Sequence, residues 1–82
     1  MPRYMLVHSH TADECRVAFA AWRGTDSPLR HTVTVGSCVA SAGTHRIWWS
    51  VDAPDEQAAL AQLPGWVAER SAIDLAGEVV IP

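Results

Sequence analysis

In residues 7–15, Val-His-Ser-His-Thr-Ala-Asp-Glu-Cys, the pattern of a strand changes into the pattern of a helix start. The run before this junction is short and apolar and ends at polar residues, which predicts a strand over residues 3–10. Its alternation places four side chains on one face of that strand, namely Tyr4, Leu6, His8 and His10. The junction therefore brings two imidazoles close to the thiol of Cys15.

The helix after the junction begins with a capping box. Thr11 is placed to accept a hydrogen bond from an amide of the first turn, and Glu14 is placed to reach back to the amide of Thr11. Gly24 is a typical end for this helix. The core face is predicted from apolar residues at helical spacing, which are Cys15, Ala18, Phe19 and Trp22.

A hairpin follows. Residues 31–39 are rich in Val and Thr and predict a strand, within which Gly36 marks a bulge or a close backbone approach. Residues 41–44 supply a turn, and residues 45–51 predict the next strand. One face of that strand carries His45, Ile47, Trp49 and Val51.

A second helix and a last strand complete the chain. The helix begins near Pro54, where acidic residues fill the first turn, and Pro64-Gly65 breaks or bends it before a short helical continuation to Arg70. Residues 73–81 predict the last strand, which ends before Pro82.

The order strand, helix, strand, strand, helix, strand predicts an α+β fold, the ferredoxin-like plait, as a single domain over residues 1–82. This fold has a four-stranded antiparallel sheet in the order 4-1-3-2, with two helices on one face. Because both faces of the first and third predicted strands carry large apolar residues, we expect a homodimer that packs through the open sheet face.

Composition excludes several classes of protein. The net charge is -3, and the six cationic residues, all arginine, are scattered along the chain, so nucleic-acid binding is not expected. The absence of lysine excludes Schiff-base catalysis and the phosphate-binding lysine of nucleotide sites, so we expect no nucleotide cofactor. No stretch is long enough to span a membrane, and we expect a cytoplasmic protein. Cys15 and Cys38 are then expected as free thiols, although a disulfide between them stays open at this point.

The predicted topology collects chemically active residues at one edge. The end of the first strand lies beside the start of the third and near the end of the second, so His8, His10, Cys15, Cys38 and His45 should gather there. Imidazole nitrogen and thiolate sulfur are ligands for Zn, Ni or Cu. The leading prediction is a small transition-metal-binding protein.

Three other interpretations remain open. Free cysteine and strand-end histidine also occur in ordinary cores, where they bind nothing. The fold also occurs in cofactorless enzymes and small-molecule binding modules of the dimeric α/β-barrel type, where a histidine would act as general base in a pocket walled by Trp48 or Trp49. An open apolar sheet face could instead recruit another protein.

The chain also resembles small bacterial proteins of uncharacterised function with a ferredoxin-like plait. The resemblance rests on short motifs, among them Tyr-Met-Leu-Val at 4–7, Asp-Glu-Cys at 13–15, Gly-Ser-Cys at 36–38 and Leu-Pro at 63–64. It differs at Ser9, where the pattern has proline, and at Ser37, which separates glycine from cysteine. The matching positions are His10, Cys15, Cys38 and His45, and His8 has no counterpart. A more distant similarity to dimeric nickel-binding plait proteins implies a metal site.

Overall fold

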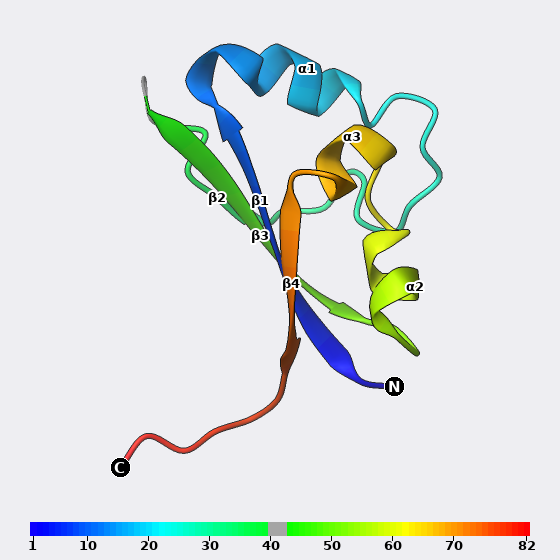
Figure 1. Ribbon diagram of the computed structural model, residues 1–82, viewed down its shortest axis with the longest axis vertical. Helices are drawn as coiled ribbons and strands as arrows, with labels where there is room; N and C mark the ends of the chain where they lie inside the picture. The colour runs from blue at the N-terminus through cyan, green and yellow to red at the C-terminus, as the bar shows by residue number, and fades with distance from the viewer. Residues whose placement is uncertain (40–42) are drawn as a thin grey trace.

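The computed structural model describes residues 1–39 and 43–82 (Figure 1). It is a small α+β structure with a four-stranded antiparallel sheet, three short α-helices and one 3-10 turn. The elements in chain order are β1 (Arg3–Thr11), η1 (Ala12–Glu14), α1 (Cys15–Ala20), β2 (Val35–Gly36), β3 (Thr44–Asp52), α2 (Glu56–Leu60), α3 (Gly65–Ala68) and β4 (Ser71–Ala76).

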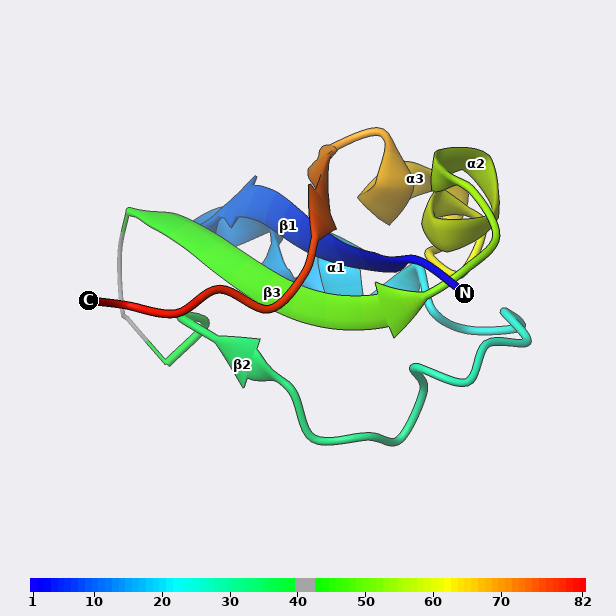
Figure 2. The same cartoon turned by 90° about the horizontal axis from the view of Figure 1, so that it is seen from below.

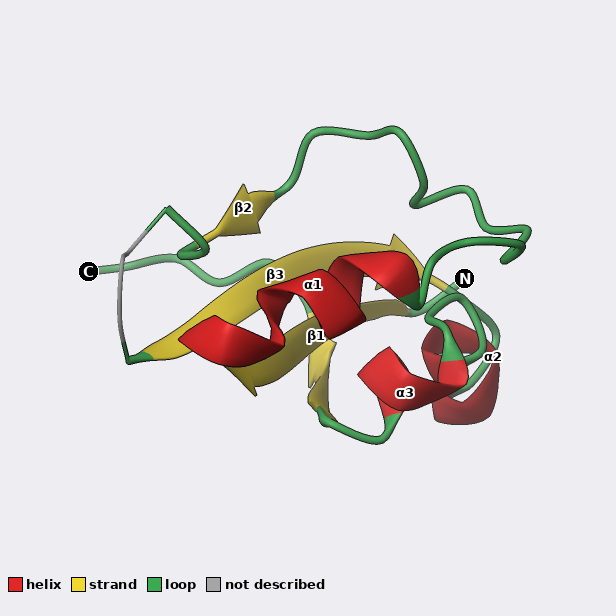
Figure 3. Ribbon diagram, turned by 90° about the horizontal axis from the view of Figure 1, so that it is seen from above, coloured by secondary structure: helices red, strands yellow, loops and turns green. Residues whose placement is uncertain are grey.

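The sheet has the order β2-β3-β1-β4, which is the predicted 4-1-3-2 order and is compatible with a plait. The strands β1 and β3 form its centre and pair along their whole length, from Arg3 opposite Asp52 to Thr11 opposite Thr44. Figure 3 shows α1 lying across these two strands. The predicted second helix is divided into α2 and α3 at Pro64, as the Pro64-Gly65 sequence indicated.

The core lies between the sheet and the helices. The predicted faces of β1 and β3 are confirmed, because Leu6 is fully buried opposite the buried Trp49 and both belong to one core cluster with residues of α2 and α3. The helical side contributes small or aliphatic residues, namely Ala59, Leu63 and Val67. On the opposite sheet face, Met5, Val7 and Trp48 are only partly buried. The sheet therefore has one packed face and one open face.

The helix α1 is shorter than predicted, and one residue of its predicted core face lies outside the core. It ends at Ala20, and turns lead on to Gly24, whose φ is 76°. Ala18 is buried, whereas Phe19 is 55% exposed. The small side chain of Ala18 faces the sheet, so Phe19, one position further around the helix, lies at the margin. The prediction that Phe19 belongs to the core is wrong.

The predicted strand over residues 31–39 is reduced to β2 at the sheet edge, beyond β3 (Figure 2). Val33 and Val39 are almost fully exposed, because the segment pairs with β3 on one side and at only two positions. A Cβ added at Gly36 would lie 3.4 Å from the carbonyl oxygen of Arg46, an ordinary van der Waals distance, so the packing there does not require glycine. Of the predicted turn at 41–44, residues 41 and 42 lie outside the described residues.

The last strand starts earlier and ends earlier than predicted. In β4, Ser71 pairs with His8 and Ala76 pairs with Arg3. Because Arg3 is the first residue of β1, the residues after Ala76 have no partner in that strand. The residues Val79, Val80 and Ile81 are accordingly exposed. The predicted end of the strand was wrong because it rested on strand propensity alone.

Candidate metal centre

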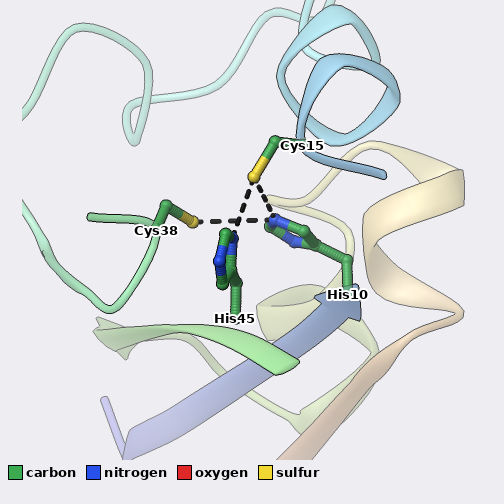
Figure 4. Close-up of side chains that lie close together, drawn as sticks. All are labelled: His10, Cys15, Cys38 and His45. Carbon is green, nitrogen blue, oxygen red and sulfur yellow. Dashed lines mark hydrogen bonds between the residues drawn. The ribbon is translucent and has the colours of Figure 1, made fainter. Parts of the chain in front are cut away.

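Four residues from four segments meet at one end of the sheet (Figure 4). His10 comes from β1, Cys15 is the first residue of α1, Cys38 follows β2, and His45 lies near the start of β3. One donor atom from each residue can be chosen so that all four lie within 4.8 Å of one another. The structure therefore brings together four of the five residues predicted for a metal site.

Backbone pairing places the two histidines. His10 and His45 are direct partners in the β1–β3 ladder and share the face that is turned toward the helices. They are 3% and 2% exposed. Their ring centroids lie 5.5 Å apart in an edge-to-face arrangement, which leaves both rings beside the same small volume.

Local hydrogen bonds place the two cysteines. The capping box is formed, with the amide of Thr11 donating to the carboxylate of Glu14 at 2.9 Å, and this turn carries Cys15 over the end of β1. Ser37 fixes the segment before Cys38, because its amide donates to the carbonyl of Arg46 and its Oγ accepts from the amide of Arg46, both at 2.8 Å. The serine that interrupts the Gly-Cys motif thus anchors the loop.

Three of the donor-to-donor distances are close to those of a tetrahedral site. His10 Nε2 lies 3.2 Å from Cys15 Sγ and 3.6 Å from Cys38 Sγ. Cys15 Sγ lies 2.9 Å from Nδ1 of His45. Zinc-to-sulfur and zinc-to-nitrogen bonds of ordinary length separate the donors of a tetrahedron by about 3.3 to 3.8 Å. Small side-chain movements would therefore complete such a tetrahedron.

His8 stands behind His10 rather than among the four. Its Nδ1 lies 3.2 Å from the carbonyl oxygen of Val67, and its Nε2 lies 2.9 Å from Nδ1 of His10. A carbonyl oxygen only accepts, so His8 Nδ1 donates, and the neutral ring then accepts at Nε2 from the Nδ1 proton of His10. This leaves the lone pair of His10 on Nε2, the atom that faces the two sulfurs.

Burial keeps these histidines neutral. Desolvation lowers the pKa of His8 below its ordinary value of 6.5, and the neighbouring His10 lowers it further, although the hydrogen bond to Val67 opposes the shift. Desolvation likewise lowers the pKa of His10, and the nearby His45 adds to the effect. A neutral imidazole is the form that binds a metal ion.

The cysteines are free thiols rather than a disulfide. Desolvation raises the pKa of Cys38, and the adjacent Cys15 raises it further. The thiol of Cys38 is therefore protonated at neutral pH when no cation is near. A bound divalent cation would reverse this preference, because a coordinating thiol is deprotonated.

One ring nitrogen of the cluster lacks a hydrogen-bond partner within the part of the chain that the structure describes. Nε2 of His45 is buried and has no hydrogen-bond partner among the described residues. An imidazole nitrogen removed from water without a partner costs free energy. The other ring nitrogen, Nδ1, is the one that faces Cys15 Sγ at 2.9 Å, so an ion bound at Nδ1 would leave Nε2 without a partner among these residues.

The tryptophans occupy different places. Trp49 is buried in the core and packs against Trp22, with ring centroids 5.8 Å apart, whereas Trp48 lies on the open sheet face. Trp49 also lines a cavity, as the small-molecule interpretation predicted. The histidine at that cavity is His31, which the sequence did not single out, and none of the clustered histidines lines it.

Comparison with known proteins finds no matching family, no matching curated protein and no matching solved structure. Within residues 1–39 and 43–82, no helix has the length and apolar character needed to cross a membrane. The fold and the cluster together define a small α+β protein with a candidate His₂Cys₂ metal centre.

Proposed function

We propose that this protein binds one transition-metal ion through His10, Cys15, Cys38 and His45. A single observation carries the proposal, namely that two imidazoles and two thiols from distant parts of the chain offer donor atoms within 4.8 Å of one another. Nitrogen and sulfur donors select zinc, copper or nickel over calcium or magnesium, which prefer oxygen.

This set of ligands is most typical of zinc. Two cysteines and two histidines in a tetrahedron form one of the common structural zinc sites, in which the protein supplies all four ligands. Catalytic zinc sites have three protein ligands and leave the fourth position to water. We therefore assign the centre a structural role, with nickel and copper as the alternatives that a metal analysis compares.

The ion would stabilise the attachment of the Cys38 segment to the rest of the fold. The segment that carries Cys38 is attached to the sheet by the two-residue strand β2, while its neighbours Val33 and Val39 are exposed. A shared ion would tie this segment to β1, α1 and β3. Because the unfolded chain holds no preformed site, the free energy of metal binding becomes free energy of folding.

The test is to refold the protein with Zn, Ni or Cu and measure bound metal by mass spectrometry. We expect about one equivalent for the wild type and near-background metal for the double variant His10→Ala, Cys15→Ala. The matched control is His31→Ala, which removes an exposed histidine outside the cluster and should retain full occupancy. Sub-stoichiometric metal in the wild type, or equal metal in the double variant, contradicts the proposal.

We also assign the ferredoxin-like plait as the fold, on the basis of the sheet order and of the helices that follow β1 and β3. Two such subunits would pack through their open sheet faces, where Val7 and Trp48 are half-buried and Val35 is 69% exposed. Sedimentation of Val35→Glu tests the dimer, with Gln57→Glu on the exposed surface of α2 as the control. A wild-type monomer at high micromolar concentration would rule the dimer out.

We also propose the cytoplasm as the location of the protein, because a reducing compartment keeps thiol ligands such as Cys15 and Cys38 reduced.

A further inference from the structure

A second candidate site lies beside the C-terminal part of α1. A cavity of about 250 Å³ opens between α1, the loop before β2, and β3. Its apolar walls are Phe19, Trp22, Leu29, Ile47 and Trp49. None of the four proposed metal ligands lines it, so the two sites are separable.

Aromatic surfaces dominate the walls. The rings of Trp22 and Trp49 are tilted by 53° to one another. Phe19 stands beside them with more than half of its surface exposed, which is unusual for a large aromatic residue in a small protein. A flat apolar ligand between Phe19 and the two indole rings would remove this surface from water.

The rim of the cavity carries positive charge. Arg30 is its one charged residue and is half-buried, held by a hydrogen bond from Nη1 to the carbonyl of Thr25 at 3.1 Å. Within the described part of the chain, no carboxylate lies within 4.0 Å of this guanidinium group. A guanidinium beside an apolar cavity, without an acidic partner, favours an anionic ligand.

Other polar groups at the rim are already engaged or fixed. The hydroxyls of Thr32 and Thr34 donate to the backbone carbonyls of Leu29 and Trp48 at 2.7 and 2.6 Å. His31 stands next to Arg30 with a φ of 63°, a left-handed conformation that few residues other than glycine adopt. Such backbone positions are frequent at ligand sites.

We propose that this cavity binds a small organic anion with an aromatic or otherwise apolar body, whose carboxylate pairs with Arg30. Its size suits a ligand of one or two rings, since larger ligand pockets span several hundred cubic ångströms. The apolar body would lie against Phe19 and the indole rings, and the anionic group would face the rim. This binding activity is independent of the metal centre.

The test uses 2-naphthoate as the probe and 2-naphthamide as its uncharged counterpart, with binding measured by calorimetry and by tryptophan fluorescence. We expect naphthoate to bind at least tenfold more tightly, because a charge-assisted pair with Arg30 is worth about a factor of ten or more. Arg30→Gln should abolish this preference without weakening naphthamide binding. Phe19→Ala, at an exposed position, should weaken both ligands.

Arg23→Gln is the matched control, since it removes an exposed arginine that does not line the cavity. It should leave the preference for naphthoate intact. The same measurements on Cys15→Ala separate this site from the metal centre, and we expect unchanged naphthoate affinity. Equal affinity for the two probes, no binding at millimolar concentration, or an equal loss in Arg23→Gln would overturn the proposal.

Discussion

Nε2 of His8 lies 2.9 Å from Nδ1 of His10, and this contact connects the candidate metal centre to the backbone carbonyl of Val67 in α3. Metal-bound histidines generally donate their second ring N–H to a partner that fixes the tautomer and the ring orientation. Here the partner is another histidine, which is itself fully buried and held in one tautomer by Val67. His8 thus acts as a positioning residue for the proposed ligand His10.

Replacement of His8 should separate positioning from packing. Glutamine can donate to Val67 from its amide nitrogen and accept from His10 on its amide oxygen, so His8→Gln should bind metal within a few-fold of the wild type. His8→Leu keeps the volume but removes the acceptor, and metal affinity should fall roughly 10- to 100-fold. The visible spectrum of the cobalt-substituted protein and the ¹⁵N shifts of His10 report the change directly. Equal affinity in the two variants would refute this role.

The stability of the metal-free protein should depend on pH because its histidines are buried. The folded-state pKa values of His8 and His10 lie below 6.5, so below pH 6.5 the unfolded chain binds protons that the folded chain does not. The free energy of unfolding should therefore hold steady above that pH and fall below it, by up to about 1.4 kcal/mol per pH unit for each histidine. Urea titrations between pH 5 and 8 measure the slope.

In that experiment, His8→Gln should reduce the slope, since one of the two groups is removed. The residues at the start of the first helix also make the free energy of unfolding depend on pH, but in a lower pH range. The pKa of Glu14 is lowered, chiefly by the hydrogen bond from the amide of Thr11, so its stabilising effect is lost only as the pH falls below 4.5. A slope that persists unchanged in His8→Gln would contradict the assignment.

Alkylation of Cys38 should respond to metal. Its raised pKa keeps the thiol protonated at neutral pH, so iodoacetamide should react slowly with the metal-free protein and faster as the pH rises. Bound metal should protect Cys38 at every pH tested, because the sulfur is then occupied. Peptide mass spectrometry identifies the modified cysteine. Equal labelling with and without metal would exclude Cys38 as a ligand.

A cap far from the cluster provides a stability reference. The side chain of Asp55 accepts from the amide of Ala58 at 2.8 Å at the start of α2. Asp55→Ala should lower the free energy of unfolding by about 1 kcal/mol. Metal affinity should stay unchanged, because α2 supplies no ligand. A lower thermal midpoint with unaltered metal content is the expected outcome.

The junction at residues 7–15 carried most of the fold information. Alternation in β1 and β3 correctly identified the buried faces because a strand with one packed face repeats every two residues. The capping box located the start of the first helix for a similarly local reason. These features, combined with the order of elements, were enough to bring His10, Cys15, Cys38 and His45 to one edge.

What the sequence could not supply depends on tertiary partners. The length of β4 is set by where β1 begins, and the exposure of Phe19 is set by how closely Ala18 approaches the sheet. The role of His8 depends on the carbonyl of Val67, which is 59 residues away. A cavity with Trp49 in its wall was predicted, but Arg30 and His31 were not assigned to it because they stand in a loop without a periodic pattern.

The spacing of the four proposed ligands along the chain has a consequence for the order of folding. His10 and Cys15 are five residues apart in the sequence. By contrast, Cys38 lies 28 residues from His10, and His45 lies 30 residues from Cys15. An ion bound first by His10 and Cys15 would then favour binding of Cys38 and His45. It would thereby speed the loop closure that otherwise costs chain entropy. Stopped-flow refolding should then be faster when zinc is present from the start than when it is added afterwards.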